Sequence, residues 1–451
     1  MVAGNRRRRW WRPGWTIATC TDCHAPFEDR GSVRPGRPPM LKRAPDRSTD
    51  RMSDTIYDEL GVPTVVNAAG TKTRIGGSLI REEAVGAMAE AAASFVRISD
   101  LQARAGGLIA DVTGAEAGYA TCGASAGLLL GAAACIAGND PRAMDQLPDT
   151  ESLADEIVIL RTHRTGYDHA LRAAGATIVD VGTNDRHLGT GSRNVEPWEI
   201  AEAITEDTAA VGYVQKEYTE PPLETVTEIA YERDVPVIVD AAAEVPPAGN
   251  LSRFVEAGAD LVAFSGGKAI RGPQTTGILA GRKDLIESVA SQHLDMHAAK
   301  PVWDPPQDLV GVDRFDGVPR QGIGRPLKVG KEELVGLIRA LELFLEEDQD
   351  ALREEWTART NRVAAALAEE PALSTRTTEG DKTSVGPEAM VTVDEEAAGL
   401  STEDLVLSLR REDPRVFVGA DSVEDAAFTI NPMCLTDEEA DYVVERIRDY
   451  L

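Results

Sequence analysis

The sequence predicts an α/β protein, with a mostly parallel sheet sandwiched by helices and a smaller C-terminal α+β domain. From Val65 to Gly281, short runs rich in β-branched residues alternate with helical stretches, which is the pattern of parallel strands joined by covering helices. The runs are almost continuously apolar, as in IVIL, AAVGYV, PVIVD and DLVAF. Strands of a parallel sheet have this composition because both of their faces are buried.

The elements of this first part follow from the spacing of apolar residues. Residues 82–95 and 101–112 have the spacing of amphipathic helices, and the apolar, small-residue run 125–136 predicts a buried helix. Further helices are predicted at 167–174, 196–204, 224–233 and 251–257. Strands are predicted at 156–160, 177–181, 209–214, 235–239, 261–264 and 277–280. Residues 284–328 are rich in Pro, Gly and His, which predicts a long irregular segment of the kind that is usually functional.

A second domain is predicted because 451 residues exceed the roughly 250–300 at which a single hydrophobic core stops growing. Apolar residues recur at steps of three and four through 330–369, the spacing of one helix face. Strand candidates follow at 389–393, 416–418 and 428–430, with helices at 402–410 and 437–449. We therefore expect a large domain over residues 52–329 and a small one over residues 330–451.

The charge of the chain is strongly negative. It carries 47 Lys and Arg residues against 75 Asp and Glu residues, a net charge of −28, and only nine of its residues are lysines. Such an acidic surface suits a salty cytosol and repels phosphate backbones, so we expect no nucleic-acid partner. There is no apolar run of about 18 residues, so no membrane-spanning helix is predicted. Five cysteines in so long a chain argue against a disulfide framework and for a reducing, cytoplasmic location.

Residues 1–51 differ from the rest of the chain. They hold 12 Lys and Arg residues against 5 Asp and Glu residues and show no helical or strand periodicity. We expect a disordered extension, or a natural start at Met52; a basic arm that binds nucleic acid is the alternative. The string CTDCH at 20–24 matches a haem-attachment motif, but no second half-site accompanies it, and we interpret it as accidental.

Asp240 and Lys268 form the strongest chemical signal. Asp240 ends the run PVIVD, and Lys268 follows the next predicted strand in FSGGK, 28 residues later, close to the length of one βαβ unit. The ends of adjacent parallel strands open onto one crevice, so a carboxylate and an amine are expected to face the same pocket. Pyridoxal phosphate requires such a pair, because a lysine binds its aldehyde and an acid holds its ring nitrogen. The alternative is that Asp240 caps a helix and Lys268 is a solvated loop residue.

Two further signals lie upstream. In TCGASAG (121–127), small residues precede a helix whose exposed N–H groups and dipole favour an anion, so Gly123, Ala124 and Ser125 are candidates for binding the cofactor's phosphate. The alternative is that these small residues only allow tight packing. In RTHRTGYDH (161–169), His163 follows a strand, and its ring is a candidate to stack on a flat cofactor. A helix-capping or surface role is the alternative for His163.

Six motifs carry a family resemblance: NAAGTKTRIGG (67–77), CGASAG (122–127), VGTNDRH (181–187), VIVDAAAE (237–244), FSGGKAIRGPQTTGILAGRKDLI (264–286) and GIGRPLKVGKEELVGL (322–337). Together they resemble the selenocysteine-synthase-like group of fold-type-I pyridoxal phosphate enzymes, and within it the D-glucosaminate-6-phosphate ammonia-lyase-like branch. The resemblance implies Lys268 as the Schiff-base lysine, Asp240 as the partner of the ring nitrogen, and His163 over the ring. It also implies the phosphate site at Gly123 to Ser125, with Ser265 as a further cofactor-binding residue.

The same resemblance bears on the substrate. The run GRPLKVGK is similar to the anion-binding stretch of the group, which puts Arg325 and Lys328 in basic positions, and Arg74 adds a further cation. A phosphorylated or carboxylated amino substrate suits these groups, because arginine pairs bidentately with either anion. The tRNA-binding domain of the selenocysteine synthases has no counterpart in residues 1–51, so anion binding without tRNA is expected.

The predicted function is a pyridoxal phosphate-dependent lyase that catalyses α,β-elimination, with ammonia release, on a polar or phosphorylated amino acid or amino sugar acid. A transferase, either selenocysteine-synthase-like or an aminotransferase, is the first alternative. A non-catalytic cofactor-binding scaffold is the second. The resemblance further implies a homodimer or higher homo-oligomer with shared active sites, acting on a small-molecule amino substrate. No metal site is predicted.

Overall fold

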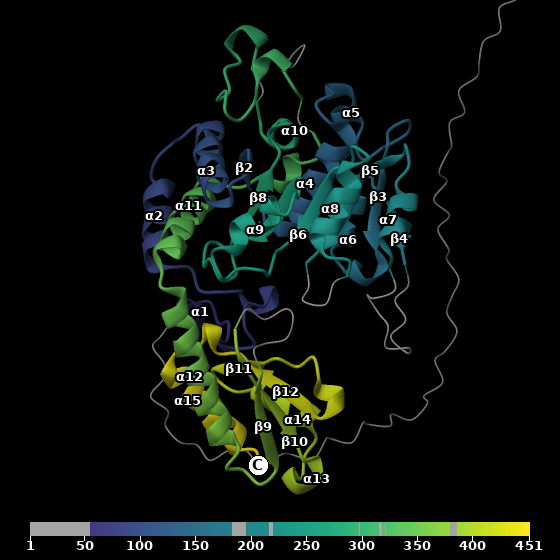
Figure 1. The fold of residues 1–451 in the computed structure, drawn as a ribbon. Coiled ribbons are helices and arrows are strands. Elements are labelled where there is room, and N and C mark those ends of the chain that lie inside the picture. Colours follow the sequence, from purple (N-terminus) through teal and green to yellow (C-terminus); the bar gives the residue numbers. More distant parts are fainter. Residues whose placement is uncertain are drawn as a thin grey trace, which may run out of the picture. The chain divides into compact units, whose positions relative to one another are not determined.

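The computed structural model describes residues 55–182, 195–215, 220–296, 298–314, 318–320, 322–378 and 386–451 (Figure 1). The predictions for residues 1–51, including the CTDCH string, lie outside this part of the chain. The same holds for positions 183–187 of the VGTNDRH motif.

A seven-stranded sheet, counted over the described residues, forms the centre of the large domain. Its strands lie in the order β2-β8-β7-β6-β5-β3-β4. They are β2 (Ala117–Thr121), β3 (Glu156–Leu160), β4 (Thr177–Val181), β5 (Thr208–Val214), β6 (Val237–Asp240), β7 (Leu261–Ser265) and β8 (Gly277–Gly281). β8 runs antiparallel to β2 and β7, and the other neighbours are parallel, so the predicted mostly parallel sheet is confirmed.

Helices cover both faces of this sheet, as predicted. Because alternate strand residues point to opposite faces, Ile157 and Ile159 pack with α4, α5, α6 and α10, whereas Val158 and Leu160 pack with α3, α7, α8, α9 and α11. In Figure 1, α2, α3 and α11 gather at the β2 end of the sheet and α7 lies at the β4 end. The bounds are α2 (Glu82–Ala92), α3 (Ile98–Thr113), α4 (Ala124–Ala137), α5 (Pro141–Gln146), α6 (Asp168–Ala173), α7 (Pro197–Ala203), α8 (Leu223–Tyr231), α9 (Asn250–Glu256), α10 (Lys283–His293) and α11 (Lys331–Glu346).

The segment 284–328 is only partly irregular, and the prediction is wrong for its first residues, which belong to α10. The reason is that Glu287, Ser288 and Gln292 of this helix are buried although they are polar, which hides the apolar spacing. Beyond α10, the described residues contain the 3-10 turns η4 (Lys300–Val302), η5 (Val312–Arg314) and η6 (Arg325–Leu327).

The C-terminal part forms the predicted smaller α+β unit. Its antiparallel sheet has the strand order β12-β10-β9. The strands are β9 (Leu373–Thr378), β10 (Glu388–Val393) and β12 (Ala427–Ile430), and the helices are α12 (Gln349–Leu367), α13 (Glu395–Ala398), α14 (Thr402–Leu409) and α15 (Asp437–Arg448). The helical stretch predicted at 330–369 is two helices, because α11 ends at Glu346 and Asp348 starts α12 by accepting the Ala351 N–H at 3.0 Å.

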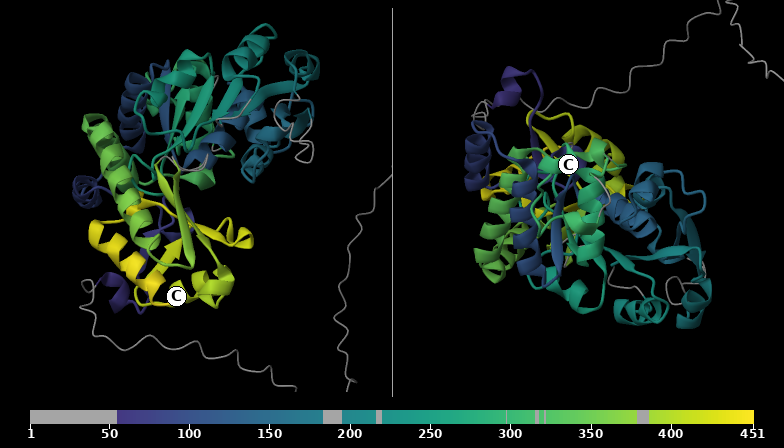
Figure 2. Two further views of the ribbon diagram at one scale, coloured as in Figure 1. Left: turned by 60° about the horizontal axis from the view of Figure 1, so that its bottom comes forward. Right: turned by 90° about the horizontal axis from the view of Figure 1, so that it is seen from above.

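Segments from the two predicted domains cross into each other's cores. After α1 (Ile56–Glu59), strand β1 (Val65–Ala68) pairs in parallel with β11 (Arg415–Val418) and contributes to the core of the C-terminal unit. Figure 2 accordingly shows purple N-terminal residues among the yellow C-terminal elements. Conversely, α11 packs into the core of the large sheet. The boundary between residues 329 and 330 stays a prediction.

The described residues contain neither a membrane-spanning helix nor a cluster of metal-binding side chains. None of their helices combines the length and the apolar character needed to cross a membrane. These residues also hold no group of three or more His, Cys, Asp or Glu side chains that could bind a metal ion.

Candidate active site

The register of the large sheet brings the predicted site residues to one edge. Thr121, the last residue of β2, pairs with Gly277, which also pairs with Ser265, the last residue of β7. Asp240, the last residue of β6, pairs with Val214 at the end of β5. The ends of four strands therefore meet at the edge where ligands bind in open α/β sheets.

Two glycines shape the turn that carries Lys268. A Cβ atom on Gly266 would lie 2.3 Å from Thr276 Oγ1, and one on Gly267 would lie 2.5 Å from Gln274 Cα. Only glycine therefore allows the chain to fold back this tightly after β7. The turn leaves the Lys268 side chain half-buried beyond the end of its strand.

The surroundings of Lys268 lower the pKa of its amine. Burial is the main cause, the Lys72 ammonium adds to it, and the carboxylates of Asp240 and Glu244 oppose it. Asp240 is also half-buried, and its Oδ1 accepts the Ala242 N–H at 3.1 Å. A larger fraction of the Lys268 amine is therefore neutral than for an exposed lysine at the same pH. Such an amine is suited to nucleophilic attack and to proton transfer.

Helix α4 begins at the same edge. Gly123 precedes it with a φ of 89°, and Thr121 Oγ1 donates to Gly123 O at 2.9 Å. A Cβ atom on Gly123 would meet no atom within 4 Å, so the space beside it is open. Ala124 is half-buried and Ser125 is exposed, and the first N–H groups of a helix have no partner within it. This helix start is suited to hold a phosphate group.

His163 lies further along the edge, in η2 (Arg161–His163) after β3. Its Nδ1 accepts the Val214 N–H at 3.1 Å, and its ring meets that of Tyr213 edge-on, with centroids 4.6 Å apart. A neutral His163 therefore carries its proton on Nε2. The ring has no exposed surface, so stacking on a cofactor requires a covering residue to move. That role of His163 stays a prediction.

The chain is similar to several known proteins. The family model described as L-seryl-tRNA selenium transferase matches residues 167–298. A 5'-C-glycyluridine monooxygenase-decarboxylase from Streptomyces sp is 32% identical over 401 residues, which are 88% of this chain and 92% of that protein. A D-glucosaminate-6-phosphate ammonia lyase from Salmonella typhimurium is 31% identical over 406 residues, which are 88% of this chain and 98% of that protein.

The chain belongs to the selenocysteine-synthase-like family of fold-type-I pyridoxal phosphate enzymes. A solved structure of D-glucosaminate-6-phosphate ammonia-lyase shares its fold, with a TM-score of 0.73 and 29% identity over 88% of this chain and 98% of that chain. The family and the fold predicted from the sequence are therefore confirmed.

Three residues are predicted to bind an anion, and one of them, Arg74, belongs to a segment that contacts the Lys268 turn. Arg74 is exposed in η1 (Thr73–Ile75), part of a segment that packs on the Lys268 turn. Ser78 Oγ in this segment donates to Lys268 O at 2.8 Å, and Gln274 Nε2 donates to the carbonyl oxygen of the first η1 residue at 2.9 Å.

Arg325 and Lys328 lie elsewhere in the chain. Both line a cavity of about 390 Å³ together with residues of α10 and of the α2–α3 connection. The Arg325 guanidinium is 3.7 Å from the Asp295 carboxylate. Arg74, Lys268 and Asp240 do not line this cavity, so it brings together only two of the three predicted cations.

Sequence reasoning missed two charged residues near Lys268. Lys72 belongs to the motif NAAGTKTRIGG, and Glu244 ends the motif VIVDAAAE, but neither directly follows a predicted strand. Both act on the charge of the Lys268 amine. A usable signal existed for Lys72, because it is one of only nine lysines and lies inside a motif that carries the family resemblance.

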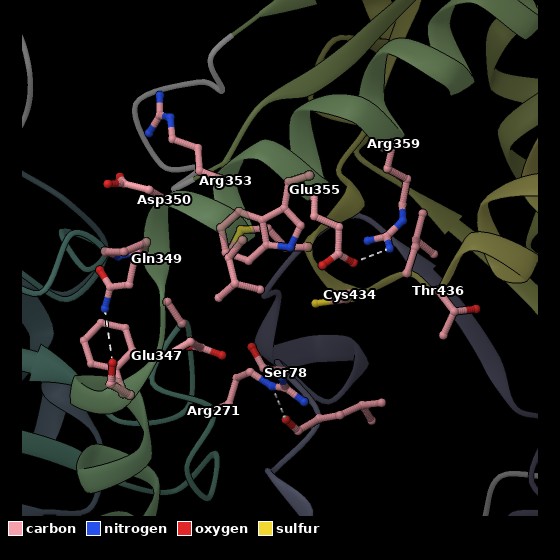
Figure 3. A pocket seen from close by; sticks show the side chains of 18 of the residues that line it. Ser78, Arg271, Glu347, Gln349, Asp350, Arg353, Glu355, Arg359, Cys434 and Thr436 are labelled. Atoms are coloured by element: carbon pink, nitrogen blue, oxygen red, sulfur yellow. Dashed lines mark hydrogen bonds and ion pairs between the residues drawn. The ribbon is translucent and has the colours of Figure 1, made fainter.

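A cavity of about 540 Å³ borders the Lys268 turn without containing the site. Ala269 and Arg271 line one part of it, and residues of α12 and of the segment before α15 line another. Figure 3 shows Arg359 and Glu355, both on α12, paired across 2.6 Å at its wall. Neither Asp240 nor Lys268 lines this cavity. The candidate active site is therefore the sheet edge with Asp240 and Lys268, and not this cavity.

Proposed function

We propose that this protein is a pyridoxal phosphate-dependent lyase that performs α,β-elimination on a polar, phosphorylated or carboxylated amino acid or amino sugar acid, with release of ammonia. The observation that carries the proposal is that the half-buried Lys268 and the Asp240 carboxylate follow adjacent strands at one sheet edge, where the carboxylates of Asp240 and Glu244 act on the Lys268 amine. Support comes from the similarity to a protein named D-glucosaminate-6-phosphate ammonia lyase, a name that describes an ammonia release from a phosphorylated amino sugar acid.

The residues at the sheet edge fit the cofactor. Lys268 offers a partly neutral amine for covalent attachment, and Asp240 offers a carboxylate for the ring nitrogen. The helix start at residues 123–125 and the Ser265 hydroxyl offer donors for the phosphate, and the open space beside the helix start leaves room for it. His163 would offer a ring for the cofactor's face only after a residue that covers it has moved.

The chain's own residues would act in turn on one substrate. When bound, pyridoxal phosphate draws electrons from the α-carbon and stabilises the charge left by removal of a proton. Once the substrate amine occupies the site, Lys268 Nζ would accept the α-proton, and burial, which lowers its pKa, would favour the neutral amine that this task requires. The Asp240 carboxylate would hold a proton at the ring nitrogen. The β-hydroxyl would leave as water by taking up the proton that Lys268 had accepted. Hydrolysis of the resulting enamine by a second water molecule would release ammonia and leave a keto acid, so the net loss is ammonia.

We further propose a homo-oligomer in which active sites are shared. Arg325 and Lys328 line a cavity that Lys268 does not line, whereas those of a second copy could reach the substrate's anionic group. Mixed oligomers of Lys268→Ala and Arg325→Gln chains should then regain part of the activity that each variant lacks alone. A stable oligomer whose mixtures regain no activity would contradict shared sites.

A transferase is the second candidate. The family model described as a selenium transferase matches residues 167–298, a range that includes both Asp240 and Lys268. Without an acceptor, a transferase would release at most one equivalent of keto acid per active site, whereas the lyase would turn over repeatedly.

The proposal is tested by cofactor loading and product analysis. With added pyridoxal phosphate, the protein should gain a visible absorption band, and borohydride treatment should leave a reduced pyridoxyl group on Lys268 that mass spectrometry locates. Lys268→Ala should lose both signals, while Lys283→Ala, at the start of α10, should keep them. Phosphorylated amino sugar acids and β-hydroxy amino acids should then yield ammonia and keto acid.

Each other result has a distinct meaning. Absence of the adduct on Lys268 refutes the proposal. An adduct with turnover only in the presence of an acceptor favours the transferase. An adduct without turnover of any amino compound leaves a cofactor-binding scaffold.

A further inference from the structure

A short segment after β1 lies directly on the Lys268 turn. It covers residues 70–78, and Ser78 Oγ at its end donates to Lys268 O at 2.8 Å. The Gly77 N–H donates to Lys72 O at 3.0 Å, which closes the segment on itself. The segment that carries Lys72 is therefore a compact turn, and its end is bonded to the Lys268 turn.

The partner of Lys72 in this structure is weakly held. The Lys72 ammonium is 3.6 Å from a carboxylate oxygen of Asp421, which lies in the loop between β11 and β12. The Asp421 side chain is 78% exposed and that of Lys72 is 33% exposed. Solvent screens such an ion pair, and 3.6 Å exceeds hydrogen-bond distance. Another anion that approaches Lys72 can therefore replace Asp421 at little cost.

The signs of the charges around Lys268 favour Lys72 as an anion partner. Three charged groups act on the Lys268 amine. Asp240 and Glu244 are negative, and Lys72 is positive. An amino acid whose amine takes the place of the Lys268 amine brings its own carboxylate two bonds away. The two protein carboxylates repel that group, whereas Lys72 attracts it.

We propose that Lys72 binds the carboxylate of the amino substrate and that Asp421 is its counter-ion in the substrate-free protein. The inference rests on the proposed function, because it takes the substrate to be an α-amino acid bound at Lys268. Binding is an exchange of anions, in which the substrate carboxylate replaces Asp421. The competing explanation is structural, namely that the pair only ties the segment 70–78 to the C-terminal unit.

Two substitutions with opposite expected effects separate these explanations. Glycolate, a carboxylate without an amine, serves as the probe, and calorimetry on the cofactor-loaded protein measures its affinity. Lys72→Gln should weaken glycolate binding at least tenfold, because it removes the attracting charge. Asp421→Asn should strengthen it two- to fivefold, because it removes the competing anion. Glycolamide, which has no charge, should bind equally to all three proteins.

Two control variants make the comparison specific. Glu424→Gln changes an exposed carboxylate in the same loop, within η7 (Val423–Asp425), and should leave glycolate binding unchanged. Lys72→Arg keeps the positive charge and should retain glycolate binding. This variant keeps the inference testable if Lys72→Gln does not fold.

Equal weakening by Lys72→Gln and Asp421→Asn would mean that the pair is structural and would overturn the inference. No change in either variant would overturn it as well. Failure of the proposed function is distinguishable, because the wild-type protein would then lack the visible cofactor band before any glycolate is added.

Discussion

Gly277→Ala should disturb the helix start that we assign to the cofactor's phosphate. Gly277 begins β8, and a Cβ atom there would lie 2.4 Å from Gly123 C and 2.6 Å from Ala124 N. Carbon atoms that are not bonded lie about 3.5–4.0 Å apart, so the start of α4 would have to move by roughly 1 Å. Over-packing of this kind costs about 1–3 kcal/mol of unfolding free energy. Pyridoxal phosphate should also bind more weakly, because the N–H groups that face its phosphate are displaced.

Two measurements test this prediction. Denaturant unfolding of the cofactor-free protein gives the change in free energy, and an absorbance titration with pyridoxal phosphate gives the affinity. Gly107→Ala is the matched control, because a Cβ atom on this exposed glycine of α3 would meet no atom within 4 Å. It should stabilise the protein by about 0.5–1 kcal/mol. The reasoning fails if Gly277→Ala unfolds at the wild-type denaturant concentration and binds the cofactor as tightly as the wild type.

Other substitutions test separate parts of the molecule. Gly106→Ala should cost about 1–3 kcal/mol in the same unfolding assay, because its Cβ atom would lie 2.4 Å from a backbone oxygen of β2, and a neutral result would contradict this packing. Asp240→Asn should lower the pKa of Lys268 further, because it removes a carboxylate that raises this pKa. The rate of cofactor attachment should then reach its high-pH plateau at a lower pH, and an unchanged pH profile would show that the two groups do not interact. Arg81→Met should cost about 3 kcal/mol, because its nearly buried guanidinium donates bonds of 2.9 and 2.7 Å to one carboxylate, whereas the exposed Arg104→Met should cost less than about 1 kcal/mol. Equal losses from these two arginine variants would refute that distinction.

Local patterns located the residues that directly follow strands. Asp240 and Lys268 each come after an almost continuous apolar run, and such a run marks a buried strand wherever it stands in the chain. The sheet register then brings the ends of these strands to one edge. Lys72 and Glu244 could not be assigned to the site in this way, because neither directly follows a strand. Their proximity to Lys268 depends on how a turn after β1 and a loop after β6 fold back, which no periodicity describes.

The sequence by itself determined the α/β class, the mostly parallel sheet and the family, because strand burial and the glycine-rich motifs are properties of short stretches of chain. Only the tertiary structure decided that β8 runs antiparallel, that β1 joins β11, and that Arg325 lines a cavity that Lys268 does not line. Each of these outcomes is a contact between segments distant in the chain. Such contacts depend on which surfaces the whole chain can bury together. A local sequence pattern does not determine which other segment a surface will contact.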